Sequence, residues 1–155
     1  MKKIGLFLGS EASNGGMFQY SQAVLDATAS LPNSKFSAVV AYTNTQWEPY
    51  LKSYKLKSLH IENAGGRFSL CNIWRTTGLP IVLWRNVAPY FNSVAKTLAH
   101  AQCDLWIFPA HDPWSYMMPV TSLASIHDLM HRYERSFPEV SAHGGYHRRE
   151  RLFRN

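Results

Sequence analysis

The chain has 155 residues, the length of a single domain, and folding at this length buries about 68–70% of the surface that the unfolded chain exposes. Hydrophobic residues make up 46% of the chain and charged residues 17%, without repeats or biased tracts, which excludes a disordered or fibrous protein. The formal net charge is +6. From Arg132 onward six arginines stand against three glutamates, a net +3, so half of the excess lies in this last part.

The cysteines and the apolar runs indicate the compartment. Cys71 and Cys103 match no metal or redox spacing and are too few to cross-link a domain of this size, so we expect free thiols. Lys2 and Lys3 have the charge of a signal peptide start, but neither its longer apolar region nor a cleavage site follows them. No run of about 18 apolar residues is present. We therefore expect a cytoplasmic protein.

The first half of the sequence predicts strands that alternate with helices. Three strands are predicted, at Ile4–Leu8, Phe36–Tyr42 and Lys55–Ile61. A polar loop with glycines, 9–16, follows the first strand. The apolar residues Met17, Tyr20, Val24, Ala27 and Leu31 then recur at helical spacing, which predicts one buried helix face. Pro32 and Asn33 stop this helix, and 45–54 is a loop or short helix.

The second half continues the alternation. Val82–Ala101 has helical spacing, with Pro89 as a break or first-turn residue, and a short helix is predicted before it, between Gly65 and Gly78. Two more strands are predicted, at Trp106–Pro109 and Val120–Ile126. A bend at Phe137-Pro138 and an arginine-rich helix from about Ala142 complete the chain. This order predicts an α/β fold, a Rossmann-like and mostly parallel sheet with helices on both faces.

Histidines follow both strands of the second half. His111-Asp112-Pro113 comes after the first of them, and His127-Asp128 closes the second. The carboxyl ends of parallel strands share one sheet edge, where open α/β sheets bind ligands. A lone loop histidine is usually only solvated, but this position favours chemistry for His111.

The same edge should carry Asn14-Gly15-Gly16, between the first strand and the first helix. Backbone N–H groups at a helix N-terminus attract phosphate, and glycine lets a ligand approach closely, so Gly15 and Gly16 are candidate diphosphate neighbours. The glycine spacing does not match the GxGxxG dinucleotide fingerprint. A simple turn is an equally good interpretation.

Two hydrolase hypotheses find less support. His127 to His131 imitates the HExxH zinc motif with Asp128 in place of glutamate, and His111 is the natural third ligand. That motif needs both histidines on one continuous helix, whereas His127 closes a predicted strand, so we expect no bound metal. Asp128 is better explained as the cap of a short helix. No GxSxG sequence indicates a serine nucleophile.

Aromatic and basic residues admit both binding and structural interpretations. The segment 146–154 interleaves basic and aromatic residues as a nucleic-acid surface would, although a solvated helix face is favoured. Four aromatic side chains in predicted loops could stack on sugar rings or belong to the core: Trp47, Tyr50, Phe68 and Trp74.

Taken in order, these motifs resemble the N-terminal half of the retaining, nucleotide-sugar-dependent glycosyltransferases once called group 1, which have two Rossmann-like domains in the GT-B arrangement. The resemblance covers nearly the whole chain. It rests on the first strand with Gly15-Gly16, strand 104–109 with His111-Asp112-Pro113 (similar to the family's His-Glu-Pro), strand end 125–129, Phe137-Pro138-Glu139 and the Tyr/Arg-rich final helix.

The resemblance implies a role for each candidate residue. Gly15 and Gly16 would face the donor diphosphate, and His111 would contact the transferred sugar. His127 and Asp128 would line the acceptor side. The family uses no bound metal and no cofactor beside its nucleotide-diphosphate sugar donor, so helix dipoles and basic side chains stabilise the leaving diphosphate. The acceptor would be a glycan, a lipid-linked sugar or another glycoconjugate, as in polysaccharide or lipopolysaccharide assembly.

The resemblance also implies a partner. Most donor-binding residues of the family belong to a second, C-terminal domain that this chain lacks, so we expect the chain alone to transfer no sugar. The alternative from another class is a non-catalytic Rossmann-like module that binds an anionic partner, nucleic acid or membrane, through its basic C-terminal helix. The glycosyltransferase hypothesis expects no nucleic acid and leaves peripheral contact with the inner face of the membrane open.

Overall fold

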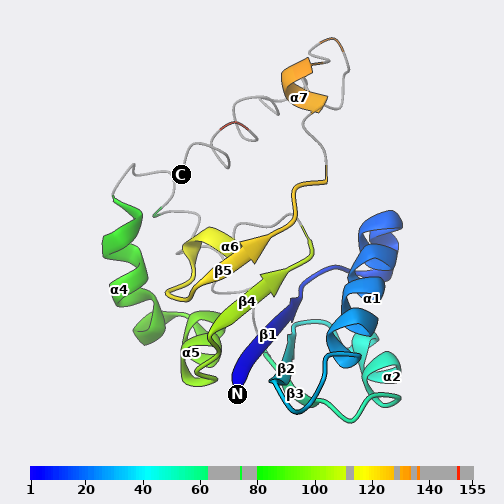
Figure 1. Ribbon diagram of the computed structural model, residues 1–155. Coiled ribbons are helices and arrows are strands. Elements are labelled where there is room, and N and C mark those ends of the chain that lie inside the picture. Colours follow the sequence, from blue (N-terminus) through cyan, green and yellow to red (C-terminus); the bar gives the residue numbers. More distant parts are fainter. Residues whose placement is uncertain are drawn as a thin grey trace. The chain divides into compact units, whose positions relative to one another are not determined.

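The computed structural model describes residues 1–62, 74, 80–110, 114–127, 130–133, 136 and 150. The chain forms two units, Met1–Ser125 and Ile126–Asn155. The first unit contains a five-stranded sheet (Figure 1), whose strands are β1 (Lys2–Leu8), β2 (Phe36–Tyr42), β3 (Lys57–His60), β4 (Leu105–Phe108) and β5 (Ser122–Ala124). All neighbours pair in parallel, in the order β3-β2-β1-β4-β5. The predicted α/β, Rossmann-like fold is confirmed.

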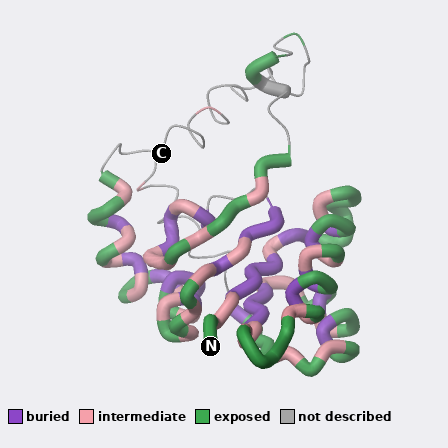
Figure 2. The backbone as a smooth tube through the Cα atoms, in the orientation of Figure 1, coloured by how far each residue is buried: buried purple, intermediate pink, exposed green. Residues whose placement is uncertain are grey.

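Helices flank the sheet on both faces. The described helices of the first unit are η1 (Ala12–Asn14), α1 (Gly16–Ala29), η2 (Thr45–Trp47), α2 (Glu48–Leu51), α4 (Ile81–Phe91), α5 (Ser93–His100) and α6 (Trp114–Met117). Helix α7 (Met130–Tyr133) belongs to the second unit. Helices α1 and α2 pack on one face, where Phe18 and Leu51 join the side chains of β1 and β2. Helices α4, α5 and α6 pack on the other face. In Figure 2 the buried residues gather on the central strands, whereas the edge strands β3 and β5 and the outer helix surfaces are more exposed.

Strand β1 lies at the centre of the sheet because its side chains are apolar on both faces. It pairs with β2 at seven positions, from Lys2 with Phe36 to Leu8 with Tyr42, and with β4 at three. Its residues Leu6, Phe7 and Leu8 are fully buried. A parallel strand covered on both faces reads as a continuous apolar run rather than an alternation, as this one does.

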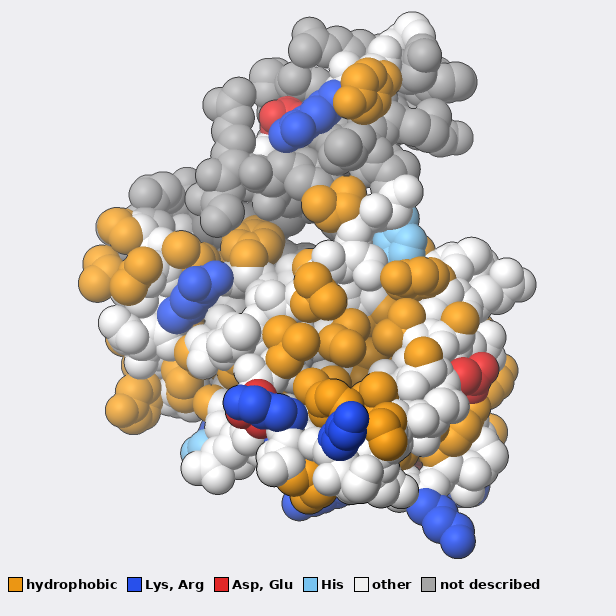
Figure 3. All heavy atoms as spheres, viewed as in Figure 1, with side chains coloured by type: hydrophobic (Ala, Val, Ile, Leu, Met, Phe, Trp, Pro, Cys, Tyr) orange, Lys and Arg blue, Asp and Glu red, His pale blue; other side chains and the backbone are white. Residues whose placement is uncertain are grey.

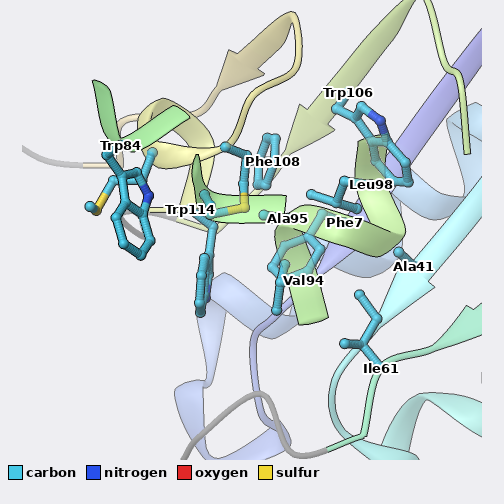
Figure 4. Close-up of a cluster of buried hydrophobic side chains, with 13 residues drawn as sticks. Phe7, Ala41, Ile61, Trp84, Val94, Ala95, Leu98, Trp106, Phe108 and Trp114 are labelled. Carbon is cyan, nitrogen blue, oxygen red and sulfur yellow. The ribbon is translucent and has the colours of Figure 1, made fainter. Parts of the chain in front are cut away.

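Gly5 of β1 lies directly against Trp106 of β4, its partner in the sheet register. A Cβ atom at Gly5 would come within 2.3 to 2.7 Å of three atoms of the Trp106 ring. Trp106 is fully buried and packs in the core under α4, α5 and α6 together with Phe7 and Phe108 (Figure 4). The glycine therefore makes room for the indole across the neighbouring strand.

Helix α1 buries a different face from the one that the spacing predicts. The predicted face contains Tyr20 and Ala27, but both are exposed. The buried residues are Phe18, Ser21, Leu25 and Thr28. Ser21 and Thr28 can be buried because each hydroxyl donates to the carbonyl four residues earlier, at 2.8 and 2.7 Å. Because these hydrogen bonds stay within the helix, the two polar side chains can be buried, and the buried face is shifted by one residue from the predicted one.

The helical region after Pro80 breaks at Asn92 and not at Pro89. Pro89 lies inside α4, and Asn92 has extended backbone angles, φ −125° and ψ 120°. Its side-chain oxygen accepts a hydrogen bond from the amide of Ala95 at 3.0 Å, which makes it the N-cap of α5. A favourable cap therefore decides the boundary more strongly than the proline.

The other element predictions have mixed outcomes. Strands β3 and β4 confirm their predictions, whereas β5 covers only Ser122–Ala124 of the predicted 120–126. Cys103 carries the expected free thiol. The predicted bend at 137–138, the final helix from about 142 and all of the predicted short helix except Trp74 lie outside the described residues.

Hydrophobic side chains remain at the surface of the β4 and β5 region. Leu123 of β5 is 57% exposed, and Ile107 of β4 is half-buried against the core on the α1 side. Figure 3 shows hydrophobic side chains gathered at the centre of this view. Within the described part of the chain, no helix is long and apolar enough to cross a membrane.

Substitution of Gly5 by alanine should destabilise the fold by about 1–3 kcal/mol, because the new methyl group overlaps a buried ring that has little room to move. Chemical denaturation would measure this. The control is Gly16→Ala, where an added Cβ meets no atom within 4 Å. In a Trp106→Leu background the Gly5→Ala penalty should shrink, since the two residues are in contact. Equal penalties in both backgrounds would contradict the packing argument.

Asp104 joins the starts of β1 and β4. Its carboxylate accepts hydrogen bonds from the backbone N–H of Lys3 at 2.7 Å and from the Lys2 ammonium at 3.2 Å. The Lys3 amide, and after it Lys2, lowers the pKa of Asp104 below its usual 3.8. A lowered pKa means that the ionised carboxylate stabilises the fold above pH 3.8 and that this contribution is lost as the pH falls through the folded-state pKa.

Asp104→Asn should therefore lower the free energy of unfolding at pH 7 and make stability less sensitive to pH below about 4. Thermal denaturation from pH 2 to pH 7 measures both effects. Glu62→Gln, an exposed position with the same change of charge, serves as control. If both variants give the same pH profile, Asp104 does not have the stabilising role derived from its hydrogen bonds.

Candidate functional site

The strand order places a switch point between β1 and β4. From β1 the chain passes to α1 on one face of the sheet, and from β4 it passes to α6 on the other. The loops that follow the carboxyl ends of these two strands therefore separate. In open α/β sheets such a separation forms the crevice that binds ligands. We take this switch point at the carboxyl edge, between β1 and β4, as the candidate site and refer to it as the crevice.

Gly15 sets the geometry where the loop from β1 enters α1. Its backbone angles are φ 52° and ψ −115°, a conformation that is open to glycine and strained for other residues. Helix α1 begins at the next residue, Gly16. A Cβ atom at either glycine would meet nothing within 4 Å. There is thus open space for a side chain at both positions. Gly15 lies between the first strand and the first helix, as predicted, whereas Gly16 is the first residue of α1.

The N-terminus of α1 begins at a glycine N-cap, which has no side chain to cap it. No side chain of the described residues caps it, and its first turn contains no acidic residue. The Gly15 carbonyl accepts from the amides of Phe18 and Gln19, at 3.0 and 3.1 Å. Across the described part of the chain, the amides of Gly16 and Met17 have no acceptor. Two N–H groups at the positive end of a 14-residue helix are therefore available to an anion.

Residues after β2 hold the β1 loop in place. The indole N–H of Trp47 donates to the Ser10 carbonyl at 2.9 Å, and the Gln46 side chain accepts from the Ala12 amide at 3.1 Å. The Ser10 hydroxyl donates to Ser21 of α1 at 3.1 Å in a buried position. Three hydrogen bonds, two from η2 and one from α1, thus hold the loop. They leave the space beside Gly15 open.

Tyr20 of α1 and Ser125, the residue after β5, are joined by a hydrogen bond. The Ser125 hydroxyl donates to the Tyr20 hydroxyl at 3.2 Å, and the Ser125 amide donates to the Phe108 carbonyl at the end of β4, at 3.0 Å. Tyr20 is 44% exposed. Two hydroxyl groups therefore lie at the carboxyl edge of the sheet. The helical spacing predicted Tyr20 on the buried face of the helix, whereas the shifted face of α1 exposes it at this edge.

The structure describes only some of the predicted site residues. His111, with Asp112 and Pro113, lies outside the described residues, and so does Asp128. His127 is described: it is exposed, it belongs to the second unit, and it follows the end of β5 by three residues instead of closing the strand. The described residues contain no group of three His, Cys, Asp or Glu side chains that could hold a metal ion.

The four aromatic residues predicted in loops have different environments. Trp47 is fully buried, packs on Phe18 with ring centroids 4.4 Å apart, and belongs to the core. Trp74 packs against Trp84 at 5.6 Å. Tyr50 is 41% exposed, and Phe68 lies outside the described residues. The core interpretation therefore holds for the two tryptophans.

A second polar group lies at the end of β2. Tyr42 is the last residue of that strand, and its hydroxyl donates to the Glu48 carboxylate at 3.5 Å. Burial, and after it the negative charge of Glu48, raises the pKa of the Tyr42 hydroxyl above its usual 10.0. Tyr42 is therefore protonated at neutral pH and acts as a hydrogen-bond donor.

Comparisons of the chain with protein-family models, with curated proteins and with solved structures found no match. The motifs of the sequence and the geometry of the carboxyl edge are therefore what indicates a function.

Gly15→Ala should cost about 1–3 kcal/mol of stability, because a side chain is strained at φ 52° and ψ −115°. Gly16→Ala, one residue later in a helical and open position, should change stability by less than about 0.5 kcal/mol. Urea denaturation of the two variants gives the comparison. Equal effects would show that the Gly15 backbone does not need a glycine.

Proposed function

We propose that this chain is the N-terminal, acceptor-side domain of a retaining glycosyltransferase that transfers a sugar from a nucleotide-diphosphate donor to a glycan, lipid-linked or other glycoconjugate acceptor. One observation supports this most: an uncapped helix N-terminus, entered through Gly15, opens at the switch point of a parallel sheet. This is the position at which α/β proteins hold phosphate groups.

The chemistry of the donor suits these groups. Sugar transfer leaves a nucleoside diphosphate with extra negative charge on the oxygen that departs. The amides of Gly16 and Met17 point outward from the positive end of α1, and such preorganised donors stabilise a developing charge without reorganisation. The proposal needs no bound metal or further cofactor.

The acceptor side of the proposed site is polar. The hydroxyls of Tyr20 and Ser125 are hydrogen-bond partners that suit sugar hydroxyls. By the resemblance, His111 would contact the transferred sugar, and His127 and Asp128 would line the acceptor path. A second, C-terminal domain would supply the remaining donor contacts, and the enzyme would work in the cytoplasm, with peripheral membrane contact as a further part of the proposal.

The alternative is a non-catalytic module that binds nucleic acid or membrane through the basic residues after Arg132. The net charge of +6 favours it. However, Arg132 already pairs with Glu150, with its Nε 2.5 Å from the carboxylate. This pair reduces the positive charge that the segment offers to an anionic partner.

The first test is a titration of the chain with uridine and guanosine diphosphates, followed by amide NMR. We expect saturable shifts at Gly15, Gly16 and Met17, and weaker binding in Gly15→Ala. Lys35→Gln, at an exposed position just before β2 and therefore at the opposite edge of the sheet, is the control. If no diphosphate shifts these amides, the donor-binding part of the proposal is wrong.

The second test addresses catalysis in the enzyme assembled with its donor-binding domain. His111→Ala should lower kcat roughly 100-fold, in the range seen when one group that stabilises transition-state charge is removed, with little change in melting temperature. The chain alone should not turn over any nucleotide sugar. Near-normal turnover by the His111 variant would remove this histidine from the reacting centre.

A further inference from the structure

A pocket of about 310 Å³ opens at the other edge of the sheet, where the strands begin. Four of the side chains that line it are basic: Lys3, Lys57, Lys96 and His100. They come from three elements, since Lys3 is on β1, Lys57 begins β3, and Lys96 and His100 are one turn apart on α5. This pocket is separate from the crevice at the carboxyl edge.

The sheet register explains why these side chains share one face. Val39 of β2 pairs with Gly5 on one side and with Lys57 on the other. Gly5 faces Trp106 in the core under α5, so Lys3, two residues earlier, and Lys57 lie on that same face. Val39 and Leu59 give the pocket an apolar floor. Lysine side chains thus border an apolar surface in this pocket.

One of the three lysines has a structural explanation. The ammonium of Lys3 donates to the carbonyl of Ala101, at 2.5 Å, and so satisfies the C-terminal end of α5. The carboxylate that is close in sequence to this end, Asp104, is occupied by Lys2 and by the Lys3 backbone amide. It does not pair with the Lys3 side chain.

The other basic side chains of the pocket, Lys57, Lys96 and His100, have no acidic partner among the residues that the structure describes. The pocket lining contains no aspartate or glutamate. Among the residues that the structure describes, no carboxylate forms an ion pair with Lys57, Lys96 or His100. Positive groups brought together from a strand and a helix repel one another, and an anion between them would relieve that repulsion. A cleft with charge of one sign and low-dielectric walls also concentrates the field on a bound ion.

We propose that this pocket binds a small, soluble phosphorylated molecule. Lys57 and Lys96 would take the phosphate oxygens, as lysine commonly does, and the Thr97 side chain offers a hydroxyl donor beside them. The carbon part of the ligand would lie against Val39 and Leu59. The volume of about 310 Å³ falls at the small end of the range for ligand pockets, which fits a phosphate ester of a few carbons rather than a nucleotide.

The test is a titration of the whole chain with inorganic pyrophosphate and with glycerol 3-phosphate, followed by amide NMR and calorimetry at low salt. We expect saturable shifts at residues 57–59 and 96–101. Lys57→Gln/Lys96→Gln should weaken binding about tenfold or more, because two charge-assisted contacts are lost. Both side chains are exposed, so the fold should tolerate the change.

The matched control is Lys35→Gln/Lys55→Gln, which removes the same charge from two exposed lysines that do not line the pocket. Equal weakening in both double variants would mean that only net charge matters, and the proposal would be overturned. The absence of saturable shifts at the pocket residues would also overturn it.

A vesicle experiment separates a soluble ligand from a lipid headgroup. The chain should not sediment with phosphatidylcholine vesicles that contain phosphatidic acid more strongly than the Lys57→Gln/Lys96→Gln variant does. Binding to these vesicles through Lys57 and Lys96, without binding of the soluble phosphates, would replace the proposed ligand by a membrane surface. The amides of Gly15 and Gly16 report the other edge in the same spectra, so the two proposals succeed or fail separately.

Discussion

The contact between Gly5 and Trp106 is the constraint on which the arrangement of the domain depends. The glycine leaves space for an indole across the two central strands, and the indole in turn fills the core beneath α4, α5 and α6. Any larger residue at position 5 would overlap the buried ring. Because β1 and β4 are also the strands at which the connections diverge, the same contact fixes the two strands that form the candidate crevice.

The two edges of this sheet have different chemistry because parallel strands all begin at one edge and end at the other. At the carboxyl edge, the positive end of α1 presents backbone amides, and the hydroxyls of Tyr20 and Ser125 lie at the same edge. At the amino edge, α5 ends in carbonyl groups, which draw cations toward them, and Lys3 fills that role. Lys3 alone donates to the carbonyl at the end of α5, so Lys57 and Lys96 are not needed there. The first edge offers backbone amides and hydroxyl groups, and the second offers lysine side chains.

Several predictions from the sequence are confirmed, because the folded structure keeps the elements that the local patterns indicate. Strands β1, β2 and β4 are apolar runs between turn residues, and the glycine loop lies between β1 and α1 as its composition indicates. Other predictions failed where a local hydrogen bond outweighed a propensity. Asn92 caps α5 and sets the break that Pro89 was expected to make. In α1 the hydroxyls of Ser21 and Thr28 donate hydrogen bonds to carbonyls of the same helix, so these two polar residues can face the core. Tyr20 is exposed as a result.

The sequence by itself determined the fold class, because the order of apolar strands and amphipathic helices permits few other arrangements than a parallel sheet with helices on both faces. It also located Gly15 and Gly16 at the start of the first helix, because a polar segment with glycines separates the apolar strand from the helical pattern. Only the tertiary structure decided that Gly5 must be small, that α1 presents Tyr20 to the crevice, and that Lys57 and Lys96 share a pocket. These facts depend on which strands are neighbours and on their register, and residues that are distant in sequence become neighbours only when the chain folds.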